Sequence, residues 1–442
     1  MTGLISKPAA GIHGTVKIPG DKSISHRVLM LGALAAGETS VTGLLESEDI
    51  SCTAQALMSL GVSITPPNQQ NNVWRIRGMG GKNLGTPKAP LHLGNSGTSA
   101  RLLMGLIAGY PVSAVLTGDA SLSLRPMGRV IKPLAQMGAR FETSNGERLP
   151  IKMTGSTNLN PVNYRLPVAS AQVKSALLLA GLHTRGKIII IEPQPTRDHT
   201  ERLLRLLGAD ITSELQPDGS NIITMEGNQP LTAKPVHVPA DPSAAAFLTV
   251  AALITKDSDI SIPDVLVNPL RTGLYDTLIE MGADISFENR RESSGETVAD
   301  IRVRSSALKG VTVPPQRVPA MIDEFPILAI AAAFAAGETM MSNLAELRVK
   351  ESDRLAAIAA GLTAAGVKVA TGENSLRVTG GNGKVRGGCT VATQLDHRIA
   401  MSFLVMGLAA QEPVAIDNAE TIATSFPSFA ALLNGLGARI GV

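Results

Sequence analysis

The sequence predicts an α/β protein with two lobes, each built from three related units. The first observation is a phrase that occurs six times: an apolar helix pattern ends at a glycine, a small or apolar residue follows, and a strand begins. These glycines stand roughly 70 to 84 residues apart, a period larger than that of any solenoid repeat, at Gly61, Gly138, Gly208, Gly282, Gly366 and Gly437. The second is a small-residue helix that runs into a strand, most clearly in residues 33–39 (ALAAGET) and 333–339 (AFAAGET). Six spaced copies of one pattern indicate duplicated α/β units.

Three units per lobe place a boundary between the third and fourth units. Pro235–Pro242 carries three prolines among short polar residues and fits a linker there. We therefore expect lobe 1 to hold residues 1–19 and 240–442, with the N-terminal strand joining it, and lobe 2 to hold residues 20–239. Two lobes joined by thin linkers can close on a ligand, so the active site is expected in the cleft between them.

Composition excludes several classes of function. Of 442 residues, 44% are hydrophobic and 17% charged, as in a globular protein, while aromatic residues make up only 3%. So few aromatic residues, with a net charge of +3, argue against a nucleic-acid partner. The longest apolar run, residues 327–336, is too short to span a membrane, and no signal peptide is recognised at the N-terminus. Cys52 and Cys389 match no metal or redox spacing, and reduced thiols favour the cytoplasm.

The first stretch with chemical character is residues 20–27 (GDKSISHR). It follows a short strand-like run and opens a helical pattern, so Lys22 and Ser23 lie in the first turn of a predicted helix and Arg27 lies one turn on. A helix N-terminus with two cations and a hydroxyl favours a phosphate or carboxylate. The alternative is a capped helix with solvated cations.

Three further stretches of the first half have the same character. In residues 93–101 (LGNSGTSAR) a turn around Gly97 opens a helix, and its backbone N–H groups could hold an anion, although neither a P-loop nor a dinucleotide fingerprint is present. Arg125 stands before a proline, which holds its backbone extended and suits bidentate capture of an anion. The alternative is that Arg125 forms a surface ion pair. Ser170 and Gln172 open another helix with neutral hydrogen-bonding groups. His199 is expected to begin a helix and not to bind a metal, because the seven histidines show no metal spacing.

The second half adds acids to cations. Asp323 and Glu324 precede an apolar helix, where acids favour the helix dipole and one could act as a general base. In residues 348–355 (RVKESDRL), Lys350 and Arg354 are expected on one helix face, where like charges repel unless an anion or acid lies between them. Arg398 begins a further helix. Together these stretches predict a cleft that binds two anionic small molecules, with acids available for proton transfer.

In combination, these motifs resemble the 5-enolpyruvylshikimate-3-phosphate synthase family over nearly the whole chain, from residues 20–27 to residues 423–427 (ATSFP). The resemblance implies a two-lobed inverse α/β barrel with three βαβαββ repeats per lobe. It implies transfer of the enolpyruvyl group of phosphoenolpyruvate to the 5-hydroxyl of shikimate 3-phosphate with release of phosphate, in aromatic amino acid biosynthesis. No metal or organic cofactor is implied, and the enzyme is expected to be a cytoplasmic monomer and a target of glyphosate.

The resemblance also implies roles for individual residues. Asp323 would accept the proton of the 5-hydroxyl, and Glu351, with Lys22, would protonate the methylene carbon. The residues implied for shikimate 3-phosphate are Lys22, Ser23, Arg27, Ser170, Ala171, Gln172, Arg197, Asp323 and Lys350. Those implied for phosphoenolpyruvate are Lys22, Gly97, Arg125, Gln172, Arg354 and Arg398.

Some positions depart from the family's best-known branch. The turn at residues 95–101 (NSGTSAR) and the triplet at 170–172 (SAQ) resemble the second, often herbicide-tolerant branch. Thr424 stands where many members of the first branch carry a phosphate-contacting lysine. Gly97 is the position at which a methyl group makes some members tolerate glyphosate, and here it is glycine.

Two other functions remain to be separated from this one. A related transferase acts on UDP-N-acetylglucosamine but usually uses a cysteine in a mobile loop, and neither Cys52 nor Cys389 lies in a comparable loop. A non-catalytic protein that binds phosphorylated metabolites would keep the cations but need neither Asp323 nor Glu351.

Overall fold

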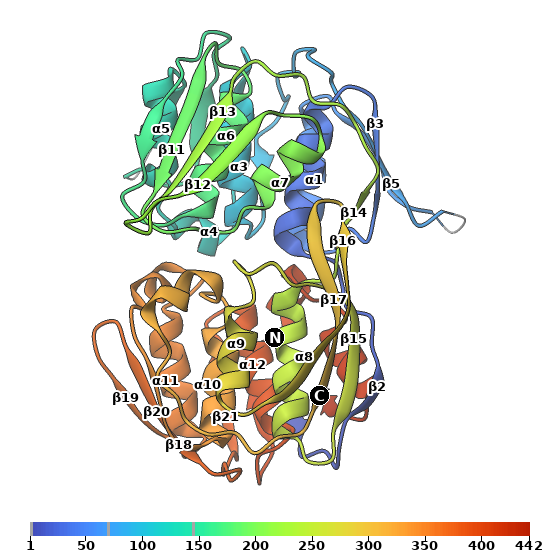
Figure 1. The fold of residues 1–442 in the computed structure, drawn as a ribbon, viewed down its shortest axis with the longest axis vertical. Coiled ribbons are helices and arrows are strands. Elements are labelled where there is room, and N and C mark those ends of the chain that lie inside the picture. The colour runs from blue at the N-terminus through green and yellow to red at the C-terminus, as the bar shows by residue number, and fades with distance from the viewer. Residues whose placement is uncertain (1–2, 69–70, 144–145) are drawn as a thin grey trace. The chain divides into compact units, whose positions relative to one another are not determined.

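The computed structural model describes residues 3–68, 71–143 and 146–442 and divides into two compact units. Unit 1 contains residues 1–19, 239–292 and 297–442, and unit 2 contains residues 20–238 and 293–296 (Figure 1). Both units alternate helices and strands, so the predicted α/β class is confirmed.

Unit 2 holds three four-stranded sheets. In strand order they are β14 (Val236–His237), β3 (Glu38–Thr42), β5 (Trp74–Arg77) and β4 (Ser63–Thr65); β6 (Leu91–His92), β7 (Ser113–Thr117), β9 (Ile151–Thr154) and β8 (Arg140–Thr143); and β10 (Asn163–Arg165), β11 (Lys187–Glu192), β13 (Asn221–Glu226) and β12 (Ile211–Leu215). Its helices are α1 (Lys22–Leu34), α2 (Glu48–Ser59), α3 (Gly97–Ala108), α4 (Ala120–Leu124), α5 (Gly128–Met137), α6 (Ala171–Gly181) and α7 (His199–Leu206).

Unit 1 also holds three sheets. They are β16 (Asp284–Ser293), β17 (Glu296–Arg304), β15 (Asp259–Leu266) and β2 (His13–Thr15); β18 (Ala336–Met341), β20 (Leu376–Gly381) and β19 (Lys368–Thr371); and β21 (Cys389–Val391), β22 (Val414–Ile416), β1 (Leu4–Lys7) and β23 (Arg439–Gly441). The α-helices are α8 (Pro242–Ile254), α9 (Gly273–Glu280), α10 (Phe325–Phe334), α11 (Arg354–Ala364), α12 (His397–Gly407) and α13 (Phe429–Gly435), and the 3₁₀ helices are η1 (Pro315–Ala320), η2 (Ala345–Val349) and η3 (Glu420–Thr424).

The six sheets share one pairing pattern, which confirms the predicted repeats. Five of the sheets have one parallel pair of strands at an edge and antiparallel pairs elsewhere. In the three-stranded sheet, isolated parallel bridges from Lys309 and Thr312 to β18 take the place of the parallel strand. The segments from β6 to β9 and from β10 to β13 each run β, α, β, α, β, β apart from the short helix α4. All six repeat glycines have positive φ, between 82° and 115°, as the first residue after a helix often requires.

The remaining repeats are completed by strands from distant parts of the chain. β2 precedes α1 in the chain but pairs with β15 of unit 1, and β14 precedes α8 but pairs with β3 of unit 2. Because β14 lies within Pro235–Pro242, this segment is part of a sheet as well as a linker. β1 lies between β22 and β23, with Ile5 opposite Ala415 and Ser6 opposite Ile440, so the N-terminal strand completes the last repeat.

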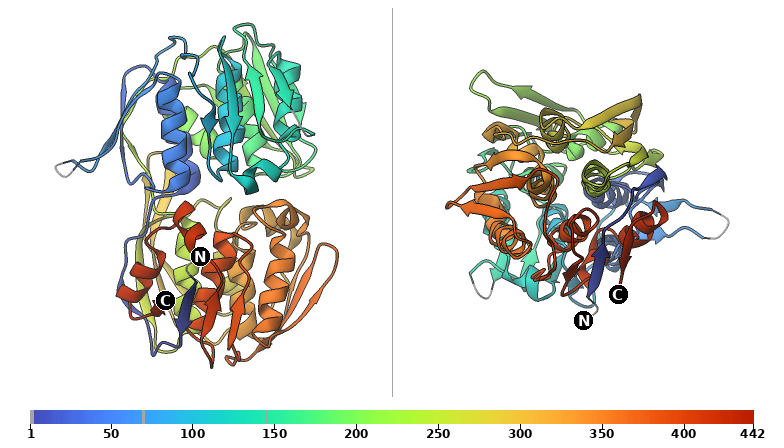
Figure 2. Two further views of the ribbon diagram at one scale, coloured as in Figure 1. Left: turned by 180° about the vertical axis from the view of Figure 1, so that it is seen from behind. Right: turned by 90° about the horizontal axis from the view of Figure 1, so that it is seen from below.

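Apolar helices form the core of each unit. In unit 1, α8, α10 and α12 contact one another, and every residue of α10 is buried, as expected of a helix that is hydrophobic on all sides. Strands β18, β19 and β20 lie on the outside of α10 and α11 (Figure 1). In unit 2, α3 packs against α6, and α1 contacts α3 and α7 (Figure 2). The beginnings of these central helices carry most of the predicted site residues.

Two sequence-based expectations concern the chain's surroundings. Among the residues described, no helix is both long and apolar enough to cross a bilayer. Cys52 and Cys389 are both free thiols.

Candidate active-site residues

The predicted helix at residues 20–27 is α1, which begins at Lys22. Its N-cap is Asp21, not Ser23, because the Asp21 carboxylate accepts the Ile24 N–H at 2.7 Å. Lys22 forms an ion pair with Asp49 of α2, and its side chain remains 21% exposed. The first turn of α1 therefore presents a partly exposed ammonium beside a helix N-terminus, which favours an anion.

Arg27 is held rigidly at the next turn of α1. Its side chain is buried, and Nη1 donates to the Ser23 carbonyl at 2.9 Å. Nη2 donates to Ser175 Oγ of α6 at 2.9 Å and Nε to Thr200 Oγ1 of α7 at 2.7 Å. The guanidinium thus joins three helices through neutral oxygens.

The second predicted turn begins α3 at Gly97. A methyl group at Gly97 would lie 2.7 Å from Arg101 Nη1 and 3.2 Å from Arg125 Nη1, so a larger residue would require both guanidinium groups to shift. Arg101 Nη1 donates to Gln172 Oε1 at 2.7 Å, and Gln172 Nε2 donates to Thr98 Oγ1 at 3.0 Å. These contacts place the starts of α3 and α6 side by side.

Arg125 caps the C-terminal end of α4 and is 8% exposed. Its Nη2 donates to Asn95 Oδ1 at 2.5 Å and to Ser121 Oγ at 3.3 Å. Asn95 in turn donates to Asp119 at 2.7 Å. This chain of hydrogen bonds fixes the guanidinium near Gly97, as anion capture requires.

The other predicted residues of unit 2 also lie at helix starts. Ser170 is the N-cap of α6 and accepts the Val173 N–H at 3.4 Å, and Ala171 and Gln172 are the first two residues of the helix. Arg197 precedes α7 by two positions. Unit 2 therefore brings its predicted residues to the starts of α1, α3, α6 and α7 and to the end of α4.

In unit 1, the predicted residues gather in a cluster of ion pairs centred on Arg354. The side chain of Arg354 is 1% exposed, and its three nitrogens point at three carboxylates. Nε donates to Asp396 at 2.7 Å, Nη2 to Glu351 at 2.6 Å and Nη1 to Asp323 at 3.2 Å.

The three carboxylates determine the charge of Arg354. Burial alone lowers the pKa of its guanidinium. The negative charges around it outweigh burial and raise that pKa above the usual range, so Arg354 is always a cation.

Lys350 shares an acid with Arg354. Its Nζ lies 3.2 Å from Asp323 Oδ1, the same oxygen that Arg354 Nη1 approaches. An acid therefore lies between the two cations, as predicted. The prediction of one helix face is wrong, because η2 ends at Val349 and α11 begins at Arg354, which leaves Lys350 outside both.

Arg398 completes the cluster from the start of α12. Its Nη1 donates to the Asp323 carbonyl at 3.1 Å and lies 3.4 Å from Glu324 Oε1. Glu324 is buried and also accepts a hydrogen bond from Ser243. The cluster holds its acids between cations, so an incoming anion would compete with carboxylates for the cations.

Thr424 ends η3, and its hydroxyl donates to the Thr421 carbonyl at 2.7 Å. It presents no charge where members of the other branch carry lysine.

Several contact residues were not predicted as part of the site. Arg101 belongs to the stretch at residues 93–101 and Asp396 stands two residues before Arg398, yet only their partners from distant segments, Gln172 and Arg354, reveal their importance. Asp396 had one local signal, since it is the N-cap of α12 and accepts the Arg398 N–H at 2.9 Å.

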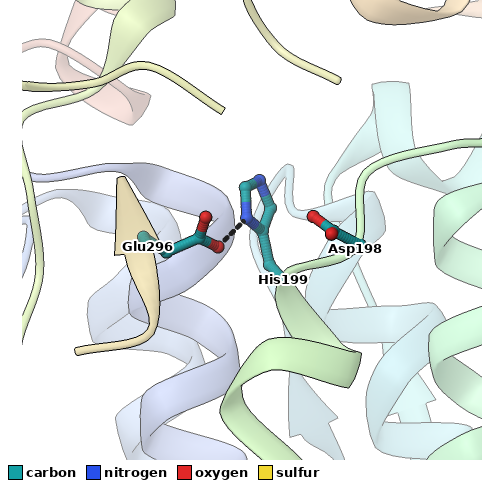
Figure 3. Close-up of side chains that lie close together, drawn as sticks. All are labelled: Asp198, His199 and Glu296. Carbon is teal, nitrogen blue, oxygen red and sulfur yellow. Dashed lines mark hydrogen bonds and ion pairs between the residues drawn. The ribbon is translucent and has the colours of Figure 1, made fainter. Parts of the chain in front are cut away.

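His199 begins α7, as predicted, and lies in a small acidic cluster (Figure 3). Its Nδ1 is 2.6 Å from Glu296 Oε1, and ligand atoms of Asp198, His199 and Glu296 come within 4.8 Å of one another. Arg202 Nε donates to Asp198 at 2.7 Å and lies 3.5 Å from Glu296. Because a guanidinium already faces both carboxylates, the cluster does not point to a metal ion.

Comparisons with known proteins agree with the sequence motifs. The family model described as EPSP synthase (3-phosphoshikimate 1-carboxyvinyltransferase) matches residues 6–433. A 3-phosphoshikimate 1-carboxyvinyltransferase of Parvibaculum lavamentivorans is 55% identical over 435 residues, covering 98% of this chain and 96% of the relative. One of Paramagnetospirillum magneticum is 56% identical over 437 residues, covering 99% and 98%.

Solved structures show the same similarity. An EPSP synthase from Acinetobacter baumannii superposes with a TM-score of 0.87 at 44% identity and covers 100% of both chains. The enolpyruvyl transferase NikO from Streptomyces tendae has a TM-score of 0.75 at 18% identity, over 99% of this chain and 98% of its own, which shows a shared fold. The expected inverse α/β fold of the enolpyruvyl transferases is thereby confirmed. By its sequence, its fold and its full-length match, this chain belongs to the EPSP synthase (3-phosphoshikimate 1-carboxyvinyltransferase) family.

Proposed function

We propose that the residues gathered in the two units carry out the reaction of the family, with both sets acting on the same two substrates. The chain transfers the enolpyruvyl group of phosphoenolpyruvate to the 5-hydroxyl of shikimate 3-phosphate and releases phosphate, a step of aromatic amino acid biosynthesis. The observation that carries the residue assignment is the clustering of cations and N-caps at the helix starts of each unit.

Shikimate 3-phosphate takes most of its contacts from unit 2 in this proposal. Its residues are Lys22, Ser23, Arg27, Ser170, Ala171, Gln172 and Arg197, joined by Lys350 and Asp323. Phosphoenolpyruvate takes Lys22, Gly97, Arg125, Gln172, Arg354 and Arg398. The rigid guanidinium groups of Arg125 and Arg354 support the second set, because fixed forks suit carboxylate and phosphate oxygens.

Asp323 acts as the base that accepts the proton of the 5-hydroxyl. Two cations 3.2 Å from its Oδ1 stabilise the carboxylate, the form that can accept a proton. As that proton leaves, the hydroxyl oxygen bonds to C2 of phosphoenolpyruvate.

Glu351, with Lys22, supplies the proton that C3 of phosphoenolpyruvate takes up in the same addition. The resulting tetrahedral intermediate breaks its C2–O bond to phosphate and returns one proton from the new methyl group to Glu351, which restores the C=C bond and the donor. Phosphate leaves as an anion, and the cations of both sets stabilise it. The proposed sequence needs no metal or organic cofactor.

The first test is phosphate release from the two substrates together and from each alone. Release that needs both substrates, and that a chelator leaves unchanged, supports the proposal. A folded protein that releases no phosphate with both would refute it and direct the test to UDP-N-acetylglucosamine as acceptor.

The role of Asp323 is tested by Asp323→Asn, which keeps the shape and removes the base. We expect kcat to fall about 10²- to 10⁴-fold, as for loss of a general base, while shikimate 3-phosphate still binds by calorimetry. The matched control is Asp284→Asn, whose carboxylate pairs with Arg304 on an outer strand, and its kcat should stay within twofold of wild type. Unchanged kcat in Asp323→Asn would contradict the assignment and favour a binding protein.

We also propose that the lobes are residues 1–19 with 240–442 and residues 20–239, except that residues 293–296 belong to unit 2, and that the enzyme acts as a monomer in the cytoplasm. The free thiols of Cys52 and Cys389 fit a reducing compartment. All residues of the proposal come from one chain, so no second copy is required. Light scattering at assay concentration tests the monomer.

A further inference from the structure

Four polar side chains of unit 2 form a buried group behind the starts of three helices. They are His26 of α1, Thr53 of α2, and Ser96 and Ser99 at the start of α3. None is more than 2% exposed. Buried polar groups cost stability unless they are hydrogen-bonded, so such a group needs internal partners.

The four side chains close a ring of hydrogen bonds. His26 Nδ1 lies 2.8 Å from Thr53 Oγ1, Thr53 Oγ1 lies 2.6 Å from Ser99 Oγ, and Ser99 Oγ lies 2.7 Å from Ser96 Oγ. Ser96 Oγ returns to His26 Nε2 at 3.4 Å. A hydroxyl has one proton to donate and can accept two hydrogen bonds, so each of the three hydroxyls has partners within the ring.

The surroundings of His26 favour the neutral imidazole. Burial, followed by the positive charges of Lys22 and Arg27, holds the pKa of His26 well below 6.5. Asp21 opposes this effect without overturning it. A protonated His26 would add a buried positive charge near those of Lys22 and Arg27.

The ring connects groups that the proposed function uses. Thr53 Oγ1 also contacts the Asp49 carbonyl at 3.1 Å, and the Asp49 carboxylate pairs with Lys22. Ser96 Oγ accepts the Ser99 N–H at 3.1 Å and so caps α3 immediately before Gly97. His26 itself lies one turn after Lys22 on α1.

We propose that His26 is a positioning residue for enolpyruvyl transfer: through Thr53, Ser99 and Ser96 it fixes the Lys22 end of α1 relative to the Gly97 end of α3. The inference rests on the proposed function, which assigns Lys22 and Gly97 to phosphoenolpyruvate. His26 does not touch substrate in this role. Misplacement of a binding group by about 1 Å can cost up to about 10²-fold in rate, so the ring influences affinity from behind the site.

The test compares two variants that break the ring with two that keep part of it. Thr53→Val removes the central hydroxyl at constant shape, and we expect the KM of phosphoenolpyruvate to rise about tenfold. Thr53→Ser keeps the hydroxyl and should stay within about threefold of wild type. His26→Leu should resemble Thr53→Val, and His26→Asn, whose amide can still donate and accept, should recover most of the loss.

The control is Thr39→Val in β3 of the same unit. Thr39 is 1% exposed, and its hydroxyl is buried outside the ring. A purely structural role of the ring predicts that Thr53→Val loses stability but, like Thr39→Val, keeps the wild-type KM in the folded fraction. Equal KM values for those two variants would therefore overturn the inference while leaving the proposed function intact. If wild type itself releases no phosphate, the proposed function fails first.

A measurement on the unaltered protein keeps the inference testable if the variants do not fold. The ring account predicts that the His26 resonances do not shift between pH 8 and pH 6 in NMR spectra of ¹⁵N-histidine-labelled protein. Titration of His26 near its ordinary pKa would overturn it.

Discussion

Replacing Gly97 with alanine tests the packing at the start of α3. The new methyl group would lie 2.7 Å from Arg101 Nη1, whereas ordinary contacts begin at 3.4 Å, so the guanidinium must move by about 0.7 Å. That shift stretches the 2.7 Å bond from Arg101 to Gln172. Arg125 Nη1, at 3.2 Å from the methyl group, must also yield by a few tenths of an ångström.

The expected magnitude follows from the hydrogen bonds at risk. A hydrogen bond to a charged group contributes about 1.5–3 kcal/mol. Losing about half of one such bond costs about 0.8–1.5 kcal/mol, which is about 4- to 12-fold in affinity. Because Gln172 and Arg125 are proposed to hold phosphoenolpyruvate, its KM should rise by about 4- to 12-fold in Gly97→Ala. The KM of shikimate 3-phosphate should rise less, because Lys22, Ser23 and Arg27 are not displaced.

Initial-rate phosphate release, with each substrate varied in turn, measures both constants. Gly435→Ala in α13 is the matched control, since nothing lies within 4 Å of its new methyl group, and its kinetics should equal those of wild type. An unchanged KM for phosphoenolpyruvate in Gly97→Ala would refute the packing argument.

Glyphosate inhibition of Gly97→Ala extends the test. We expect the inhibition constant of glyphosate to rise more than the KM of phosphoenolpyruvate, as the family's tolerant members suggest for a methyl group here. Equal losses would count against that expectation.

Two further predictions concern stability. Lys174→Met leaves the buried carboxylates of Glu192 and Glu201 without their shared cation, and it should lower the free energy of unfolding by about 3–5 kcal/mol in urea titrations. The control is Lys132→Met at an exposed ion pair, which should change that free energy by less than about 0.5 kcal/mol. Similar losses in both variants would contradict the prediction. Burial lowers the pKa of His183 to about 4, so the unfolded chain takes up a proton that the folded chain refuses as pH falls from 6.5 towards 4. Stability should decline by about 3 kcal/mol over that window, and His183→Phe should remove this part of the decline; an unchanged pH dependence would show that His183 does not cause it.

Local patterns predicted much of the fold and of the site. The six repeat glycines, each expected at the end of a helix, all have positive φ, as glycines after helices commonly do. Lys22, Gly97, Ser170 and Arg398 lie at or next to the helix starts that were expected for them. Helix starts can be recognised from sequence because capping and periodicity depend on residues a few positions apart.

Such local patterns could not predict which residues from distant segments would contact one another. Arg354 is surrounded by its chain neighbour Glu351 and by Asp323 and Asp396, which two distant segments supply. Lys350 was placed on the helix of Arg354, yet the chain leaves helical structure between η2 and α11 while Asp323 still joins the two cations. No periodicity encodes which distant acid will meet a buried guanidinium.

The sequence alone determined the α/β repeats, the helix starts and the residue types available for anion binding, because each depends on short-range backbone preferences. The tertiary structure alone decided which strands complete the repeats: β1 joins β22 and β23, and β14 joins β3. It also decided that residues 293–296 belong to unit 2, where Glu296 meets His199. Those contacts link segments tens to hundreds of residues apart, and long-range packing and electrostatics select them only when the whole chain is folded.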